Sequence, residues 1–286
     1  MAEAKNLECK NCGAMLNFDP SKVSMNCVFC GSTFFVEIPE TEEDKQMRQN
    51  AEIITFKVTK DEAKIKFSDW IKKGLFKPSN LATTFREKEF EGAYIPFHKV
   101  RADATTQWRG RDKIVIREAT DNTPAEYEYH DRSGTHSESY KDFITATKGL
   151  QQSEVDSVMP FDDNDTKPYD QQLLMGFKFE KPAIKSDNAE NSAKDRIKNW
   201  ERDACSKGVD EILNTDTMIS NIESKLIMLP IWILVYLYEG KPFRVFINGQ
   251  NGKISGQKPV SKIKVIIALL ITAAVCAAIY FAAKGR

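Results

Sequence analysis

The chain contains 286 residues, of which 41 are basic and 41 acidic, so its formal net charge at pH 7 is zero. This balance argues against a protein whose whole surface binds nucleic acid, although it leaves room for a local basic patch. Hydrophobic residues make up 41% and charged residues 29% of the chain, which is the usage of a folded globular protein. Because no apolar stretch precedes the first cysteine, we expect no secretory signal peptide.

The first forty residues contain two Cys-x-x-Cys-Gly units, with the cysteine pairs Cys9, Cys12 and Cys27, Cys30. Two residues between thiolates allow both sulfur atoms to reach one metal ion, and the following glycine permits the turn. Four thiolates complete a tetrahedral site, so the spacing predicts one structural, non-catalytic Zn²⁺ ion. An iron site would use the same sulfur atoms, whereas disulfides are disfavoured because the topology predicted below places these cysteines in a reducing cytosol.

Residues 1–40 resemble a zinc ribbon of the general-transcription-factor-B type, which implies a small unit of short strands held by metal. Zinc ribbons bind proteins in many cases and nucleic acids in others, so the fold alone does not define the partner. Acidic residues outnumber lysines in this segment: Glu3, Glu8, Asp19, Glu37 and Glu40 against Lys5, Lys10 and Lys22. Because an acidic surface repels phosphates, we favour protein contact over nucleic acid.

A domain boundary is expected near residues 40–52, where the sequence becomes strongly polar, followed by an α+β domain over residues 41–260. Residues 59–73 are predicted to form its first helix, because apolar residues recur there at helical spacing. Between Lys57 and Lys77, seven lysines face three acidic residues. This excess indicates either a patch for anionic lipid or nucleic acid, or a solvated helix face, and we favour the solvated face.

Alternating apolar and polar residues predict the strands of this domain. The clearest pattern runs from Gly92 to Trp108, as a half-buried strand requires. Further strands are predicted from Lys113 to Glu118, from Ala125 to His130 and from Ser139 to Thr147. Together they indicate an antiparallel meander.

The second half of the domain is predicted to contain one helix and a pair of strands. The helix runs from Asp187 to Lys207, where small and aromatic residues form one stripe. The apolar run from Lys225 to Tyr238 is too short to cross a bilayer and is interrupted by a proline, so we predict a buried strand. Glu239-Gly240 is expected to turn the chain into a further strand from Phe243 to Asn248.

Two short segments of this domain are similar to one another: Ile-Pro-Phe-His at residues 95–98 and Leu-Pro-Ile-Trp at residues 229–232. Each follows a predicted helix and precedes a strand-rich segment. The match indicates either an internal duplication or a coincidence.

Residues 265–283 form an uninterrupted apolar run without charge, proline or glycine. About 20 apolar residues of helix cross the hydrocarbon core, so we predict one transmembrane helix within a tail of residues 261–286. A buried helix of a soluble core is the alternative, but a partly exposed core helix would show a polar face. More basic residues precede the run than follow it: Lys253, Lys258, Lys262 and Lys264 against Lys284 and Arg286. The positive-inside rule therefore predicts a single-pass protein of the cell membrane with the bulk of the chain in the cytoplasm.

Small residues recur along the predicted transmembrane helix, namely Ala268, Thr272, Ala273, Ala274, Ala277 and Ala278. Such residues allow two helices to approach closely, so a homo-oligomer is a further expectation.

Beyond the cysteines, the sequence contains no Walker loop, dinucleotide-binding fingerprint, Gly-x-Ser-x-Gly or His-Glu-x-x-His motif, so we do not expect an enzyme. His130 and His136 are interpreted as exposed loop residues. The acidic cluster around Asp163 is interpreted as a solvated turn, because it lacks the glycine and terminal glutamate of a calcium loop. Cys205 is expected to be a buried thiol, and Cys276 to face lipid or a neighbouring helix.

The order of motifs along the chain is similar to that of a bacterial family of zinc-ribbon membrane proteins. The motifs are the ribbon, a helix, GAYIPF at 92–97, KPYD at 167–170, a helix, LPIW at 229–232, EGKPF at 239–243, INGQNGK at 247–253 and the terminal apolar helix. Some members are encoded beside phage-shock-type and stomatin/prohibitin/flotillin-type membrane proteins. The resemblance implies a membrane adaptor that recruits partners during envelope stress. The chain departs from the pattern at His98, where an aromatic residue is expected.

Three hypotheses follow for the function. The first is a membrane-anchored, cytoplasm-facing adaptor that docks protein partners through the zinc ribbon and has no catalytic residues. The second is a membrane-tethered nucleic-acid-binding protein that uses residues 57–77 with Arg109, Arg111 and Arg117, and steep salt dependence would reveal it. The third is an enzyme built from scattered residues, for which a deep polar pocket in the middle domain would be the sign.

Overall fold

The computed structural model describes residues 51–286 except 121–122, 181 and 285–286, together with four short strands within the first fifty residues. These strands are β1 (Lys5–Glu8), β2 (Met15–Phe18), β3 (Ser24–Asn26) and β4 (Thr33–Phe35). Strand β1 pairs antiparallel with β2, and β3 pairs antiparallel with β4. In the sequence, one Cys-x-x-Cys unit falls between the strands of each pair. The four cysteines themselves lie outside the described residues.

Two very long strands form the centre of the fold, β6 (Arg86–Arg117) and β10 (Glu211–Tyr238). They pair antiparallel along most of their length, and β7 (Glu126–Thr145) extends the sheet beyond β6. On the other side, β11 (Lys241–Asn248) and β12 (Ile254–Gly256) follow β10. The short strands β5 (Glu52–Ile53), β8 (Lys167–Pro168) and β9 (Lys178–Phe179) complete an eight-stranded sheet within the described part of the chain. The predicted mixture of helices and an antiparallel sheet is therefore confirmed.

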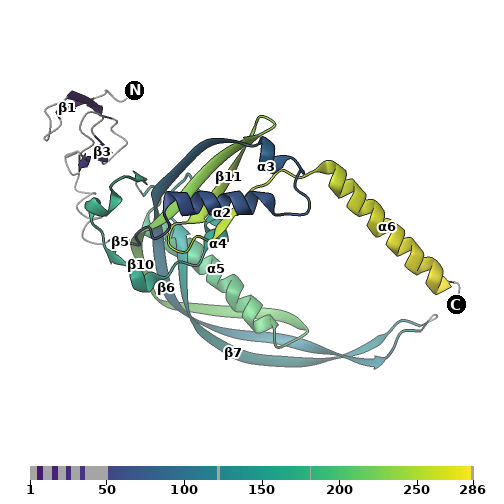
Figure 1. Ribbon diagram of the computed structural model, residues 1–286. Helices are drawn as coiled ribbons and strands as arrows, with labels where there is room; N and C mark the ends of the chain where they lie inside the picture. Colours follow the sequence, from purple (N-terminus) through teal and green to yellow (C-terminus); the bar gives the residue numbers. More distant parts are fainter. Residues whose placement is uncertain are drawn as a thin grey trace.

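The sheet divides into a central part and a projecting arm, which we define as residues 102–117 of β6, 126–141 of β7 and 211–220 of β10 (Figure 1). Most residues of the arm are exposed, apart from those under α5 such as Ala102 and Ala104. The predicted strands left gaps at residues 109–112 and 131–138. These gaps are wrong, because β6 and β7 run through them without interruption. Charged residues persist in these strands because solvent reaches much of the arm and opposite charges face one another across strands. Arg111 pairs with Glu211 at 2.7 Å, and Arg132 with Asp112 at 2.8 Å.

Helices α2 (Lys60–Lys72) and α5 (Ser186–Ser206) confirm the two predicted helices of the domain. Thr59 and Glu62 form a capping box at the start of α2, so two backbone N–H groups find acceptors there. The two helices cover the same face of the sheet. Helix α2 packs with Phe90 of β6, whereas α5 packs with Ala102 and Ala104 of the same strand. Because alternate residues of a strand point to the same face, these three even-numbered residues all lie on one face of the sheet.

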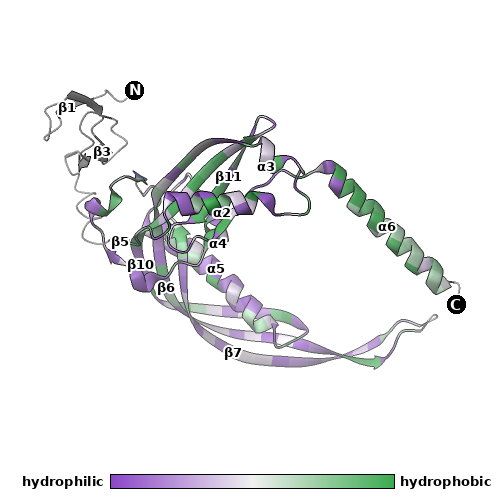
Figure 2. Ribbon diagram, viewed as in Figure 1, coloured by the Kyte–Doolittle hydropathy of each residue, from purple (hydrophilic) through white to green (hydrophobic). Residues whose placement is uncertain are grey.

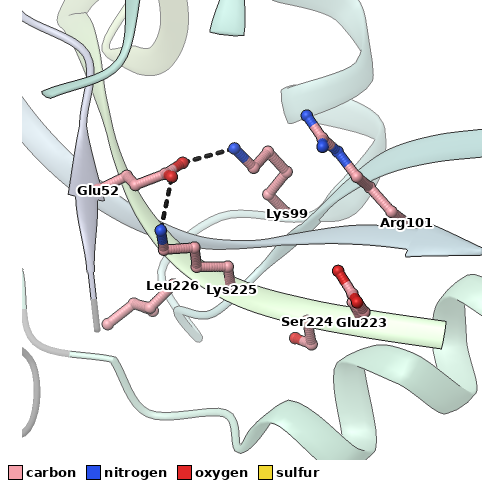
Figure 3. Close-up of a pocket in the computed structure, with 7 residues that line it drawn as sticks. All are labelled: Glu52, Lys99, Arg101, Glu223, Ser224, Lys225 and Leu226. Carbon is pink, nitrogen blue, oxygen red and sulfur yellow. Dashed lines mark hydrogen bonds and ion pairs between the residues drawn. The ribbon is translucent and has the colours of Figure 1, made fainter. Parts of the chain in front are cut away.

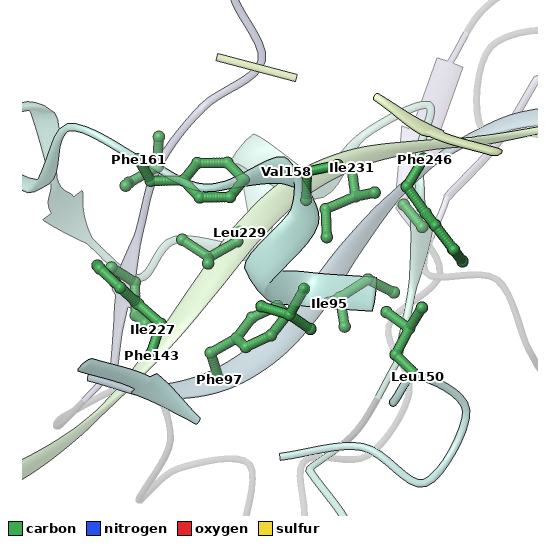
Figure 4. Close-up of a cluster of buried hydrophobic side chains, with 13 residues drawn as sticks. Ile95, Phe97, Phe143, Leu150, Val158, Phe161, Ile227, Leu229, Ile231 and Phe246 are labelled. Atoms are coloured by element: carbon green, nitrogen blue, oxygen red, sulfur yellow. The ribbon is translucent and has the colours of Figure 1, made fainter. Parts of the chain in front are cut away.

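The opposite face is covered by α4 (Gln152–Val158) and the chain that follows it, as Figure 4 shows. Val158 and Phe161 pack there on Phe97, Leu229 and Ile231, all of which are at most 4% exposed. The smaller helix α3 (Leu81–Thr84) and the 3₁₀ turns η1 (Asp163–Asp165) and η2 (Gln171–Leu174) connect the larger elements. The core thus consists of two apolar layers separated by the strands β6 and β10.

The two similar Pro-containing segments lie on adjacent strands but are offset in register, because only Ile95 and Leu229 face one another, whereas Pro96 faces Met228 and Pro230 faces Tyr94. In both halves of the domain a long strand follows a helical segment and then pairs with the next long strand in the chain: β6 with β7, and β10 with β11. Helix α2 packs near β10 and β11 and on Phe90 of β6, whereas α5 contacts all three strands of the arm.

Local sequence explains the turn between β10 and β11. The two loop residues Glu239 and Gly240 have φ angles of 49° and 77°. A two-residue hairpin of this kind requires positive φ at both positions, which glycine adopts without strain. The predicted Glu-Gly turn and the strand after it are confirmed.

The C-terminal helix α6 (Lys262–Lys284) projects from the domain, and Figure 2 shows that it is hydrophobic along its length. Within the described residues it is the one helix long and apolar enough to span a membrane, over Lys262–Ala283, and none of its spanning window is buried against the rest of the chain. The prediction of one membrane-compatible helix at this end is therefore confirmed.

Candidate functional site

A charged concavity of about 740 Å³ opens beside the middle of strands β6 and β10, as Figure 3 shows. Its lining residues come from three strands and are Glu52, Lys99, Arg101, Glu223, Ser224, Lys225 and Leu226. Lys99 and Lys225 are direct partners in the β6–β10 register, as are Arg101 and Glu223, so these side chains point to the same face. Glu52 reaches that face from β5.

Glu52 lies between two ammonium groups, at 2.5 Å from Lys99 Nζ and 2.7 Å from Lys225 Nζ. Burial opposes ionisation of this carboxyl, but the hydrogen bonds from the two lysines outweigh burial and hold the pKa of Glu52 below its usual value. At neutral pH the site therefore contains a carboxylate shared by two cations. It holds β5 against the two central strands.

Asp163 forms a second ionic centre next to the first. Its carboxylate lies 2.5 Å from Lys141 Nζ and 3.1 Å from Arg101, and Lys99 approaches to 3.9 Å. The side chain is only 9% exposed, so the interpretation of this acidic cluster as a solvated turn is wrong for Asp163. Burial opposes its ionisation, but the hydrogen bonds and the nearby positive charges lower the pKa of Asp163. Asp163 therefore binds cationic side chains of the same chain rather than solvent.

One residue that lines the concavity, Ser224, has its hydroxyl group near a histidine, His98. Ser224 Oγ lies 3.4 Å from His98 Nδ1, and His98 Nε2 lies 2.8 Å from the carbonyl oxygen of Ile184. Because a carbonyl only accepts hydrogen bonds, His98 Nε2 is the donor to Ile184. Strand alternation directs both side chains to the face covered by α5, opposite Lys99 and Lys225. The hydroxyl and the imidazole are thus separated from the charged groups of the concavity.

Helix α5 is joined to the arm by a buried polar cluster around Glu201, whose side chain is 0% exposed. His136 Nδ1 lies 3.0 Å from Glu201 Oε1, and the Tyr140 hydroxyl donates to the same oxygen at 2.7 Å. Burial opposes ionisation, but hydrogen bonds from Thr106, Tyr140 and His136 outweigh it and lower the pKa of Glu201. The interpretation of His136 as an exposed loop residue is wrong, because it lies in β7 and contacts the helix.

The Glu201 cluster makes the stability of the α5–arm contact dependent on pH. The lowered pKa means that ionised Glu201 stabilises the fold above its usual pKa of 4.5, and that this stabilisation is lost as the pH falls through the lowered value. We expect Glu201→Gln to reduce the free energy of unfolding by about 2 kcal/mol at pH 7. The difference from the native protein should shrink below pH 4.5. Urea unfolding of the detergent-solubilised protein, followed by tryptophan fluorescence, measures both values.

The exposed Asp195 on the same helix supplies the control for this prediction. Asp195→Asn removes one carboxylate from α5 without touching the cluster, so it should leave the unfolding free energy within about 0.5 kcal/mol of the native value. Equal effects of both substitutions, or an effect of Glu201→Gln that does not depend on pH, would contradict the role assigned to Glu201.

The remaining candidate residues lie apart from one another. His130 is in β7 and not in a loop, with its ring exposed and 3.1 Å from Glu128. Cys205 is buried, as expected, and Cys276 is exposed on α6. Among the residues whose side chains are described, no group of three or more His, Cys, Asp or Glu could hold a metal ion. The predicted ligands Cys9, Cys12, Cys27 and Cys30 lie outside that set.

Sequence reasoning missed the charged concavity, because its residues come from three distant segments. Glu52 lies 47 residues from Lys99 and 173 from Lys225. The only local signal was an acidic residue at the start of the domain and single charges within otherwise apolar strands. Such charges indicate a partner, but not which one.

Comparisons with known proteins add one relative. No family model matches the chain, and no solved structure matches it. The chain is similar to a Bacillus subtilis (strain 168) protein named "Uncharacterized protein YdjG", with 27% identity over 228 residues. The aligned region covers 75% of this chain and 65% of YdjG, so the chain spans slightly less than two thirds of that relative's length.

Proposed function

We propose that this protein is a membrane-anchored adaptor whose bulk faces the cytoplasm and which docks protein partners through an N-terminal zinc ribbon. The observation that carries the proposal is α6. Its spanning segment, Lys262–Ala283, is strongly apolar, and none of the spanning window is buried in the chain. An apolar helix that packs on nothing in its own protein is stable in a lipid bilayer and costly in water. Lysines at its N-terminal end favour a cytoplasmic domain.

The two hairpins of the first forty residues support the zinc ribbon. Each Cys-x-x-Cys unit falls between antiparallel strands, β1 and β2 or β3 and β4. A short connection between two antiparallel strands can direct both of its thiolates at one ion. The two hairpins together would then hold the Zn²⁺ through Cys9, Cys12, Cys27 and Cys30. A closed four-thiolate site contributes folding energy to a unit too small for a core of its own. Its role is then to present a stable surface to a partner.

The charges of the middle domain favour an adaptor over a nucleic-acid-binding protein. Arg111 pairs with Glu211 at 2.7 Å, and Arg117 with Glu126 at 3.1 Å. Lys57 pairs with Asp165 at 2.6 Å. A phosphate would have to compete with a carboxylate for each of these groups. The concavity is also internally neutralised in large part, which supports a structural or binding role for it over catalysis.

The test is crosslinking of the full-length protein in its native membrane, followed by identification of the copurifying molecules. The Cys27→Ser, Cys30→Ser variant should remain in the membrane and lose a protein partner that the native chain retains. Cys276→Ser is the control, because it changes a cysteine outside the ribbon and should retain the partner. Recovery of nucleic acid with steep salt dependence, or of the same partners from all three proteins, would contradict the proposal.

A further inference from the structure

The loop between α2 and α3 exposes two large apolar side chains beside the start of α6. Leu75 is 79% and Phe76 is 42% exposed. Single exposed apolar residues are common on protein surfaces and need no explanation by themselves. These two differ because the loop is attached to the residues that lead into the membrane-compatible helix, and α3 and α6 lie at the same end of the domain (Figure 1).

Hydrogen bonds fix the loop to the segment before α6 at two places. The backbone N–H of Ser261 donates to the carbonyl oxygen of Phe76 at 2.7 Å. The ammonium of Lys258 donates to the carbonyl oxygens of Trp70 and Lys73, at 2.5 and 2.7 Å, and so caps the end of α2. The same ammonium lies 3.8 Å from the centre of the Trp70 ring. The depth of the loop relative to α6 is therefore set by the fold.

The position of Ser261 determines where the loop lies relative to a bilayer. The apolar run begins at Val265, four residues later in the sequence. At a rise of about 1.5 Å per residue, Ser261 is about 6 Å from the edge of the hydrocarbon. The headgroup region on each side of a bilayer is about 5–7 Å thick, which is half the difference between the total thickness of the bilayer and the thickness of its hydrocarbon core. Phe76, bonded to Ser261, then lies within the headgroup layer.

The charge of this region matches an anionic surface. Five lysines surround the loop and the start of α6, namely Lys72, Lys73, Lys77, Lys262 and Lys264. The sequence contains no acidic residue from 70 to 86 and none from 240 to 286. Lysines at a membrane surface attract anionic phospholipids, and neighbouring apolar side chains insert between the headgroups.

We propose that the loop of residues 73–77 is a second membrane contact, in which Leu75 and Phe76 insert into the interface of an anionic phospholipid bilayer and the lysines bind its headgroups. This inference rests on the proposed anchoring by α6. It adds that the domain does not swing freely on its tail: the loop holds the α2–α3 end at the membrane.

The test uses the full-length protein with Leu75 replaced by the photo-crosslinking residue p-benzoylphenylalanine, reconstituted into phosphatidylcholine vesicles with or without phosphatidylglycerol. Vesicle flotation first reports whether α6 anchors the protein. The crosslinker at position 75 should then yield lipid adducts, more of them when phosphatidylglycerol is present. Met218, which is 75% exposed on the arm, is the matched control position and should yield none.

A second variant tests the charges separately from the apolar contact. Lys73→Gln and Lys77→Gln are combined in the chain that carries the crosslinker at position 75. The substitutions should reduce the protein's preference for vesicles with phosphatidylglycerol over vesicles without it, by about fivefold for each lysine replaced. Flotation without lipid adducts at position 75 would overturn the inference and leave the anchoring intact. Absence of flotation would overturn both. Equal adduct yields at positions 75 and 218 would also overturn the inference.

Discussion

Replacement of both Ala273 and Ala274 by arginine should release the full-length protein from the membrane fraction. These residues lie near the middle of α6, and both are exposed. An arginine at the centre of a transmembrane helix costs about 3 kcal/mol for insertion, so two cost about 6 kcal/mol. Because α6 packs on nothing else in the chain, the substitutions should leave the domain folded. Extraction with alkaline carbonate, followed by quantification of both fractions, measures the change.

Ala273→Leu with Ala274→Leu is the matched control for this experiment. It changes the same two positions and keeps the helix apolar, so the protein should stay in the membrane fraction. If the native protein is itself extracted by carbonate, or if the arginine variant remains as firmly bound as the leucine variant, α6 is not a transmembrane anchor.

The second large effect is expected at the cysteines. The purified full-length protein should contain one Zn²⁺ ion per chain, and Cys27→Ser with Cys30→Ser should abolish its binding. Structural zinc sites bind with about 10–16 kcal/mol near neutral pH, so loss of two of four thiolates removes more energy than a unit of forty residues can replace. Elemental analysis measures the metal. Limited proteolysis of residues 1–40, with and without a chelator, measures the accompanying loss of structure.

Cys276→Ser is again the control, because it should retain the full metal content and the same resistance to protease. Iron in place of zinc would confirm the four-thiolate site but not the predicted ion. A metal-free native protein with two disulfides would contradict both the site and the cytoplasmic location of these cysteines.

Local patterns predicted several elements of the domain because each depends on residues close in the sequence. Helix α2 begins after Thr59, whose hydroxyl and the Glu62 carboxylate satisfy the first backbone groups. Helix α5 follows from its stripe of small and aromatic residues, and the β10–β11 hairpin from Glu239-Gly240. The apolar run of α6 needs no partner at all for its prediction. In each case, the physical cause lies within one turn or one helix.

The length of β6, β7 and β10 could not be predicted in the same way. The charged residues at 109–112 and 131–138 resemble loops when each strand is considered alone. They continue as strands because their neighbours supply backbone hydrogen bonds and opposite charges, as Arg111 finds in Glu211. For the same reason, His136 becomes a partner of Glu201 rather than a loop residue.

The sequence by itself therefore determined the two helices, the membrane-compatible tail and the prediction of a four-cysteine site, since these depend on spacing and local composition. Only the tertiary structure decided that Glu52 joins Lys99 to Lys225, that α2 and α5 cover the same face of the sheet, and that the loop of residues 73–77 lies at the start of α6. Contacts of this kind link residues tens to hundreds of positions apart. Their energy comes from burial and from charge pairing between strands, which no local pattern records.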